Sequence, residues 1–275
     1  MSNRFRTTFA ACLLFLLGGA PRLSAQFDLF VAQIADGAGF FSEISVHNPG
    51  PSDTSCTFST FDDGGNPLAL IYDSGTASPA SLRTRHHAVK AAATSPVSSV
   101  NFTVPAEGTT TLDTSGLGDG GTTALIGGAE LNCASFVIGG VTYWLTSGSE
   151  MVTGIGVPAI NTTTAFRVVG GNEFTAFAFY NPGNALALRL DAYDGDTGAL
   201  VDSVIISIPP GGHIAFNARD QLTNLPSGFY GSFRVPTNGQ QFVPLALGVA
   251  STNANEAGFL LYTIASLSGE IVGID

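Results

Sequence analysis

Short runs in which apolar residues alternate with small or polar ones recur along most of the chain. In the run that starts at Leu186, for example, Leu188, Leu190 and Ala192 share one side of an extended segment, and the residues between them share the other. This period of two is typical of a strand that packs one face on a core and turns the other to water. No run of useful length has the 3.6-residue period of an amphipathic helix, so the pattern predicts an all-β protein.

The same alternation, interrupted by turns rich in Gly, Pro, Asn and Asp, sets the expected strand boundaries. In the first half, strands are expected at 27–34, 41–46, 54–61, 68–72, 100–104, 109–112, 124–133, 136–138, 141–145 and 151–160. In the second half, they are expected at 166–169, 174–180, 185–193, 200–208, 213–217, 228–235, 242–250, 257–264 and 270–274. A short helical turn is expected at 219–222, where the alternation breaks.

One stretch of the pattern occurs twice. Alternating apolar residues lead into an Asn-Pro-Gly triplet at Asn48 and again into one at Asn181. Other positions of the first copy also have counterparts later in the chain. The counterpart of Phe61 lies 132 residues further on, and that of Val104 lies 104 residues further on. An echo over most of the chain indicates an internal duplication. The smaller second offset means that the first copy carries an insertion, near 70–99, that the second copy lacks.

The duplication divides the chain into two domains of ordinary size. We expect a first β-sandwich at 26–160, which contains the insertion, and a second at 161–275. The composition agrees, because 34 Gly and 20 Phe with only 11% charged residues suit short strands and many turns. The connection at 161–164 is short and polar, so the two domains are expected to be joined tightly.

The first 25 residues have the features of a secretory signal peptide. Arg4 and Arg6 precede an apolar segment at 9–17, and small residues follow as far as Ala25, where we expect cleavage, with Ala20 as the second choice. The apolar segment is too short to stay in a bilayer as an anchor, and no later segment has the length and apolarity of a transmembrane span. The protein is therefore expected to be extracellular or periplasmic.

Cleavage leaves a strongly acidic chain. Three of the ten basic residues, Arg4, Arg6 and Arg22, leave with the signal peptide, so seven remain against 21 acidic ones, a net charge of −14. The summed negative field repels phosphate, which argues against nucleic acid and anionic membranes as partners. Solubility of a secreted protein explains the acidity, and a cation-rich partner surface is the alternative.

Two cysteines remain in the mature chain, Cys56 and Cys133. In the alternating pattern both fall on the inward side of the first domain, and an exported chain meets oxidants, so a Cys56–Cys133 disulfide is predicted. The chain-entropy model gives a loop of this length about 4 kcal/mol of stabilisation. Two buried free thiols are the alternative.

Three acidic residues cluster at the hairpin that follows the run at Leu186: Asp191, Asp194 and Asp196. Oxygen ligands from turns are the set that calcium prefers, so calcium is the one metal considered. The alternative is that these aspartates bond the backbone of a tight turn. The spacings of an EF-hand loop, a zinc site, a hydrolase nucleophile and a phosphate loop are all missing from the sequence, so we expect no cofactor and no enzyme activity.

Two other groups of residues are candidates for ligand contact. Tyr143 and Trp144 are adjacent, and an exposed pair of this kind stacks on sugar rings, whereas a single buried Trp is an ordinary core residue. The insertion gathers basic and imidazole side chains that are scarce elsewhere: Arg83, Arg85, His86 and His87. They would form a partner-binding or metal-binding loop, or else a solvated surface loop.

The turns of the two copies share three motifs. A strand runs into Asn-Pro, a Phe-Asp or Tyr-Asp pair with Gly makes a hairpin, and an aliphatic residue precedes Pro and Gly. The corresponding segments are 46–49, 61–65 and 104–108 in the first copy and 179–182, 193–198 and 208–212 in the second. This set resembles a group of uncharacterised secreted bacterial repeat proteins. The resemblance implies two tandem immunoglobulin-like β-sandwich domains outside the cytoplasm, and it brings no catalytic residues.

These features predict a secreted, non-enzymatic binding or structural module that acts at the cell surface or in the extracellular matrix. Its partner would be an extracellular protein or a glycan, and exposed edge strands would allow self-association. The alternative function is that of a carbohydrate-binding, lectin-like protein or of a carbohydrate-acting one.

Overall fold

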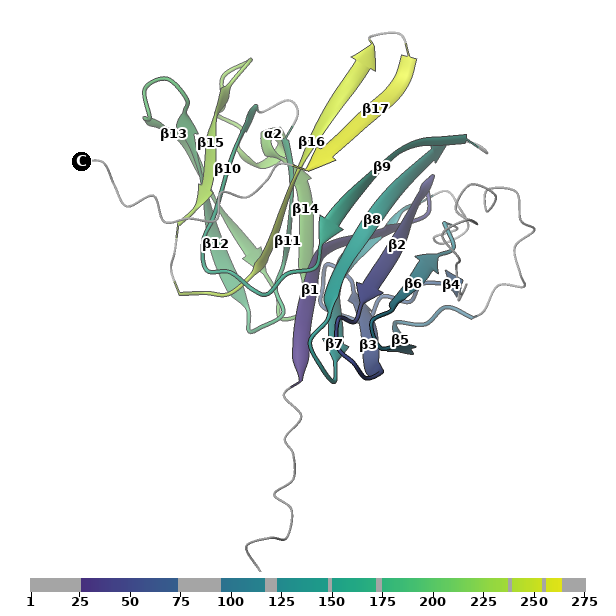
Figure 1. The fold of residues 1–275 in the computed structure, drawn as a ribbon. Helices are drawn as coiled ribbons and strands as arrows, with labels where there is room; N and C mark the ends of the chain where they lie inside the picture. Colours follow the sequence, from purple (N-terminus) through teal and green to yellow (C-terminus); the bar gives the residue numbers. More distant parts are fainter. Residues whose placement is uncertain are drawn as a thin grey trace, which may run out of the picture.

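The computed structural model describes residues 26–73, 95–116, 123–147, 150–171, 175–236, 239–253 and 256–263. These residues form seventeen strands and one short helix, so the predicted all-β class is confirmed (Figure 1). The strands pair antiparallel in four sheets. Within the described part of the chain, no helix is long and apolar enough to cross a bilayer.

The first half of the chain forms two of the sheets. Its strands are β1 (Phe27–Asp36), β2 (Phe40–His47), β3 (Thr54–Phe61), β4 (Tyr72–Asp73), β5 (Ser99–Val104), β6 (Thr109–Thr114), β7 (Leu125–Cys133), β8 (Ile138–Ser147) and β9 (Glu150–Pro158). Sheet A has the order β1-β7-β3-β5, and sheet B has the order β4-β6-β2-β8-β9.

The second half forms the other two sheets. Its elements are β10 (Phe166–Gly171), β11 (Thr175–Tyr180), β12 (Leu186–Asp194), β13 (Leu200–Ile208), β14 (His213–Asn217), α2 (Ala218–Gln221), β15 (Tyr230–Val235), β16 (Val243–Asn253) and β17 (Glu256–Thr263). Sheet C has the order β10-β15-β12-β13, and sheet D has the order β14-β11-β16-β17. When the strands are counted along each half and β4 is left out, sheet C has the same strand order as sheet A, and sheet D has that of sheet B.

A buried asparagine holds the corresponding corner of each half. Asn48 donates from Nδ2 to three backbone carbonyls, including that of Val104 at 3.2 Å, and accepts the N–H of Gly50 at Oδ1. Asn181 also donates from Nδ2 to three carbonyls, including that of Ile208 at 3.2 Å. Both side chains are fully buried. The Asn-Pro-Gly triplets therefore end the same kind of corner in both halves.

The alternation along each strand places apolar side chains between the paired sheets. In β12, Leu188 and Leu190 are buried and Arg189 between them is exposed, as the period of two predicts. The core between sheets A and B is mainly aliphatic. The core between sheets C and D is rich in aromatic rings, which include Phe166, Phe177, Phe179, Phe229, Phe233 and Phe242.

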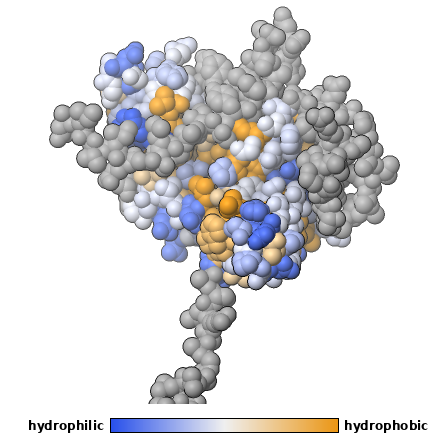
Figure 2. Space-filling view, viewed as in Figure 1, coloured by the Kyte–Doolittle hydropathy of each residue, from blue (hydrophilic) through white to orange (hydrophobic). Residues whose placement is uncertain are grey.

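The two halves share a packed boundary, because β11 of sheet D is buried on both faces. Ala178 and Tyr180 on β11 turn away from the core between sheets C and D and pack with the core of the first half. The Tyr180 ring lies between Phe30 and Phe61, with centroid distances of 6.4 and 6.1 Å. Gly128 permits this approach, because a Cβ there would lie 2.1 Å from the Tyr180 ring. Figure 2 shows apolar residues gathered in the middle of the viewed face, where the halves meet.

The segment around the insertion differs from expectation. The strand expected at 68–72 is reduced to β4, which has two residues, and Leu70 makes only an isolated bridge with Val97. Pro67 stands at the start of this segment and has no N–H to donate, which works against a continuous ladder. The rest of the insertion, 74–94, lies outside the described residues.

Three other boundaries complete the comparison with the sequence pattern. The strand expected at 136–138 is wrong except for Ile138, which begins β8, and β8 continues through the run expected at 141–145 because Gly139 and Gly140 keep the ladder with β2 continuous. The helical turn expected at 219–222 is confirmed as α2, one residue earlier. The strand expected at 270–274 lies outside the described residues.

Candidate binding surfaces

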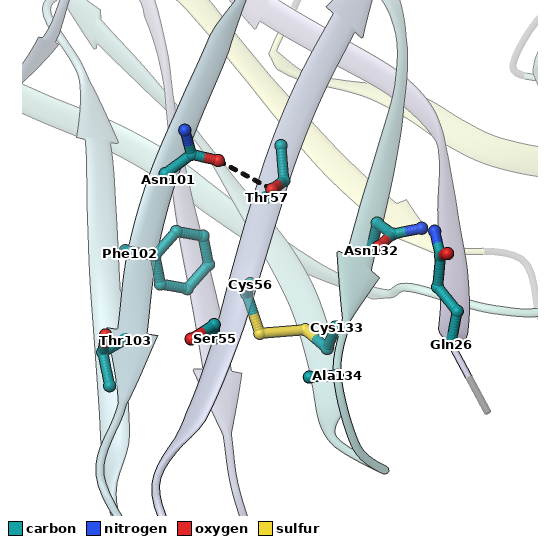
Figure 3. Close-up of a pocket in the computed structure, with 10 residues that line it drawn as sticks. All are labelled: Gln26, Ser55, Cys56, Thr57, Asn101, Phe102, Thr103, Asn132, Cys133 and Ala134. Atoms are coloured by element: carbon teal, nitrogen blue, oxygen red, sulfur yellow. Dashed lines mark hydrogen bonds between the residues drawn. A yellow bond between two sulfur atoms is a disulfide. The ribbon is translucent and has the colours of Figure 1, made fainter. Parts of the chain in front are cut away.

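The predicted disulfide is confirmed, and it lies beside a hollow on sheet A. Cys56 on β3 and Cys133 on β7 are directly opposite, with Cα atoms 4.2 Å apart and their sulfur atoms bonded. Both residues are buried, as their place on the inward side of the strands predicts. The hollow has a volume of about 480 Å³. Figure 3 shows the disulfide among the residues that line it.

The hollow is polar but carries no ionisable side chain. Hydroxyl and amide groups line it, contributed by Ser55, Thr57, Asn101, Thr103 and Asn132. The Thr57 hydroxyl donates to Asn101 Oδ1 at 2.7 Å, so part of this polarity is satisfied internally (Figure 3). Acid–base and nucleophilic chemistry need a titratable group or an activated nucleophile. The hollow therefore offers hydrogen bonding to a polar ligand and no chemistry of its own.

The structure does not bring the three candidate calcium ligands together. Asp191 is buried on the outer face of sheet C, where its Oδ1 accepts a hydrogen bond from Arg189 at 2.7 Å. Asp194 lies at the turn after β12, where its Oδ1 accepts hydrogen bonds from Thr197 and from the N–H of Asp196. The bonds from Thr197 lower the pKa of Asp194. Among the described residues, no three His, Cys, Asp or Glu side chains could hold one metal ion.

Tyr143 and Trp144 point to opposite faces of β8, so they do not form a joint platform. Tyr143 is buried, its hydroxyl donates to the backbone carbonyl of Gln33, and burial raises its pKa. Trp144 is half-buried on the outer face of sheet B and stacks on Phe41 at 6.2 Å between ring centroids. Its ring covers Gly154, where a Cβ would lie 2.2 Å from the indole. The single Trp is thus neither fully exposed nor part of the core.

Two groups of predicted residues lie outside the part of the chain that the structure describes. One is the basic and imidazole cluster of the insertion, Arg83, Arg85, His86 and His87. The other is the expected signal peptide, 1–25. Both interpretations stay predictions.

Two polar pairs cross the boundary between the halves. The Tyr180 hydroxyl donates to Glu130 Oε1 at 3.0 Å, and burial raises the pKa of both side chains. The His213 side chain is fully buried, and its Nδ1 lies 2.8 Å from Oδ1 of the exposed Asp63. No described side chain hydrogen-bonds His213 Nε2, so this His–Asp pair does not continue to a nucleophile as a catalytic triad does. The pairs act as contacts between the halves.

The outer face of sheet C carries side chains that the sequence pattern did not single out. The pairing of its four strands aligns two neighbouring rows across the sheet. One row is Arg167, Arg234, Asp191 and Ser203, and the next is Val169, Ser232, Tyr193 and Leu200. We define the arginine face as the outward side chains Arg167, Arg189 and Arg234 with Val169, Tyr193, Leu200, Ile205 and Tyr230. It holds three of the seven basic residues of the mature chain.

The apolar side chains of the arginine face are strongly exposed. The exposed fractions are 70% for Ile205, 66% for Tyr230, 49% for Leu200 and 40% for Val169. These are four of the eight exposed large hydrophobic residues in the described part of the chain. Phe136 and Ile138, each 56% exposed, make a smaller apolar group around the start of β8. The arginine face is therefore the largest gathering of exposed apolar side chains among the described residues.

The sequence contained part of the signal for this face. Alternation along β12 already turned Arg189, Asp191 and Tyr193 outward. Arg167 and Arg234, however, are far apart in the chain, and their meeting depends on the pairing of β10 with β15. The sequence alone does not show that these arginines lie on one face, because that depends on the order of the strands in sheet C.

Comparison with known proteins does not assign a function to these surfaces. A scan against protein-family models found no match, and a search of curated proteins found no significant match. The resemblance to secreted bacterial repeat proteins stays a prediction. Function is therefore inferred from the geometry and the charge of the surfaces themselves.

Proposed function

We propose that this protein is a secreted, non-enzymatic binding or structural module that acts at the cell surface or in the extracellular matrix, with the arginine face as its contact surface. The exposure of Ile205, Tyr230 and Leu200 on one open sheet face is the observation that carries the proposal. Soluble proteins rarely leave large apolar side chains gathered in solvent unless a partner covers them. Tyr and Arg beside aliphatic residues are also the composition found at the centres of protein–protein contacts.

The secreted location is supported by two independent features. The first residues carry the charge and apolar pattern of a signal peptide. The Cys56–Cys133 disulfide belongs to the oxidising compartments outside the cytoplasm, where such bonds persist. An acidic mature chain fits a protein that must stay soluble there.

The proposal includes an architecture of two tandem immunoglobulin-like sandwiches that arose by duplication. Matching strand orders in sheets A and C, and in sheets B and D, support it. The equal hydrogen bonding of Asn48 and Asn181 supports it further. In such a pair, the outer face of one copy can acquire a binding role while both copies retain the same strand order.

The test is binding of the mature protein, residues 26–275, to intact cells of the producing organism. Wild-type protein is expected to bind saturably, and Ile205→Lys is expected to weaken binding by about tenfold or more because it replaces the most exposed apolar side chain of the face by a charge. Ile138→Lys is the matched control, since Ile138 is also an exposed isoleucine, 56% exposed, and lies on β8 outside the arginine face. Equal binding by wild type and Ile205→Lys would overturn the choice of surface.

Two further results would change the functional class. Hydrolysis of any polysaccharide that disappears on a single Asp or Glu substitution would replace the non-enzymatic interpretation. Saturable binding on a glycan array that is lost on Trp144→Ala would favour carbohydrate binding instead. The Phe41–Trp144 stack on the outer face of sheet B is the observation behind that second candidate.

A further inference from the structure

The arginine face contains a pair of like charges that the fold does not neutralise. Arg167 and Arg234 are directly opposite on β10 and β15. Directly opposite residues have Cβ atoms about 5 Å apart, and equal charges at that separation destabilise a sheet. Among the described residues, neither arginine forms an ion pair with a carboxylate.

The nearest carboxylate in the row is already engaged. Asp191 stands opposite Arg234 on β12, yet its Oδ1 accepts from Arg189 Nε at 2.7 Å and from the Ser203 hydroxyl at 2.6 Å. Its Oδ2 lies 3.4 Å from the Tyr193 hydroxyl, which donates to it. The face thus carries three guanidinium groups and one carboxylate, Asp191. That carboxylate pairs with Arg189, so it does not neutralise Arg167 or Arg234.

Of the two arginines, Arg234 is positioned by its neighbours and Arg167 keeps an unsatisfied donor. The Arg234 guanidinium lies 4.3 Å from the centroid of the Tyr193 ring, and its Nε donates to Ser232 Oγ at 3.2 Å. Arg167 Nε is buried and has no hydrogen-bond partner among the described residues. A buried donor without a partner costs free energy, so the packing around Arg167 does not compensate its guanidinium group from within the described fold.

We propose that Arg167 and Arg234 together bind a carboxylate group of a protein partner. A carboxylate accepts two parallel N–H bonds from a guanidinium group, and one negative charge at the pair offsets the repulsion between the two arginines. The inference rests on the proposed function, which makes this face the contact surface. It adds the chemistry that the partner must present there.

The surroundings of the pair favour a protein segment over an acidic polysaccharide. Val169 lies in the neighbouring row, and Leu200 and Ile205 lie farther across the same face. Branched aliphatic side chains are covered well by the apolar side chains of a polypeptide and poorly by the hydroxyl groups of a sugar polymer. We therefore expect an Asp or Glu of the partner flanked by apolar residues.

A random copolymer of Glu and Tyr is a suitable probe, and polygalacturonate at equal carboxylate concentration is the comparison. Wild-type mature protein is expected to bind the copolymer more tightly than polygalacturonate. Arg167→Gln and Arg234→Gln are each expected to weaken copolymer binding by about tenfold or more, the loss typical of one charge-assisted hydrogen bond. Arg219→Gln removes the same charge from exposed α2 and is expected to leave binding unchanged.

Unfolding of the free variants separates a binding role from a structural one. Arg167→Gln is expected not to lower the denaturation midpoint, because it removes both the repulsion and the unpartnered donor. A lowered midpoint with unchanged copolymer binding would show that Arg167 is structural and overturn the inference. Equal or tighter binding of polygalacturonate would overturn the choice of a protein partner. Absence of any copolymer binding by wild type would overturn the site itself.

The outcomes also separate this inference from the proposed function. If Ile205→Lys abolishes binding to cells while both arginine variants bind the copolymer like wild type, the contact surface stands and the carboxylate site fails. If the arginine variants lose the copolymer while Ile205→Lys binds cells like wild type, the carboxylate site stands and the proposed function fails.

Discussion

Sheets A and C occupy the same place in the two halves, but their outer faces have different chemistry. On sheet A, Thr57 and Asn101 face each other across β3 and β5 and hydrogen-bond each other. On sheet C, the pair in the same place is Arg189 and Ile205, and Ile205 is 70% exposed. The backbone arrangement is shared, so it does not determine the surface. On sheet A the two polar side chains satisfy each other, whereas on sheet C Arg189 pairs with Asp191 and leaves the Ile205 side chain exposed to solvent.

The cores differ as well, and each difference suggests a way to test the comparison. In the first half a disulfide crosses sheet A, and at the corresponding place on β12 the second half has the buried Leu188. The second half relies on packed aromatic rings. If the first half depends on its disulfide and the second on its aromatic core, removing each of these features should lower the free energy of unfolding.

The largest effect is expected from Phe179→Ala in the aromatic core. Phe179 is fully buried, stacks on Phe177 at 6.0 Å and meets the Phe166 and Phe242 rings edge-on at 5.9 Å. Loss of such a ring leaves a cavity and lowers the free energy of unfolding by about 4 kcal/mol. Urea denaturation measures the change. Phe136→Ala, at an exposed ring, is the control, and an equal loss there would contradict the assignment of Phe179 to the core.

The disulfide of the first half comes next. The double variant Cys56→Ala, Cys133→Ala opens a closed loop with a sequence separation of 77 residues. We expect it to lower the free energy of unfolding by about 4 kcal/mol, mainly by freeing the unfolded chain. Denaturation of wild type in dithiothreitol should reproduce the variant. No change in either experiment would mean that the aliphatic core of the first half suffices without the bond.

The two asparagine corners provide a matched pair. Asn48→Ala and Asn181→Ala each remove the donor of three backbone carbonyls in a buried corner. Each is expected to cost about 2 kcal/mol of unfolding free energy, because buried carbonyls lose their partner. Thermal or urea denaturation of both variants gives the comparison. Clearly unequal losses would show that the corners differ in role despite their equal hydrogen bonds.

The smallest effect is expected at the boundary, from Glu130→Gln. Burial raises the pKa of Glu130 in the folded state, so its protonation stabilises the fold at low pH and that stabilisation is lost as pH rises through the raised value. Gln keeps an acceptor for the Tyr180 hydroxyl without the charge. The variant should therefore match or slightly exceed wild type at pH 7 and show a flatter stability profile as the pH rises above the ordinary glutamate value of 4.5. A profile identical to that of wild type would exclude Glu130 as the titrating group.

Much of the fold follows from the sequence pattern, because alternation is a local property. The period of two located β3, β13 and β14 at their observed bounds, and it turned Cys56 and Cys133 toward the same core. Their disulfide followed from that placement. Strand boundaries elsewhere differ by a few residues at turns, where Gly and Pro allow more than one ending.

The rest depends on contacts between distant segments. Alternation predicts that each strand has one solvent-exposed face. However, β11 is buried on both faces because Tyr180 packs on the first half. The pairing of Arg167 with Arg234 requires the order of sheet C, which no local rule supplies. The position of Trp144 on a half-buried outer face follows from the neighbours Phe41 and Gly154, which only the register of sheet B brings to it.

The boundary between the halves is also asymmetric. On β11, Ala178 and Tyr180 seat against the first half, whereas the strand in the same place of sheet B, β2, carries Ser45 and His47. The first half thus carries polar side chains on β2, where the second half carries the side chains of β11 that pack at the boundary. The contact between the halves is therefore directional, because it depends on β11 of the second half and not on the strand in the same place of the first half.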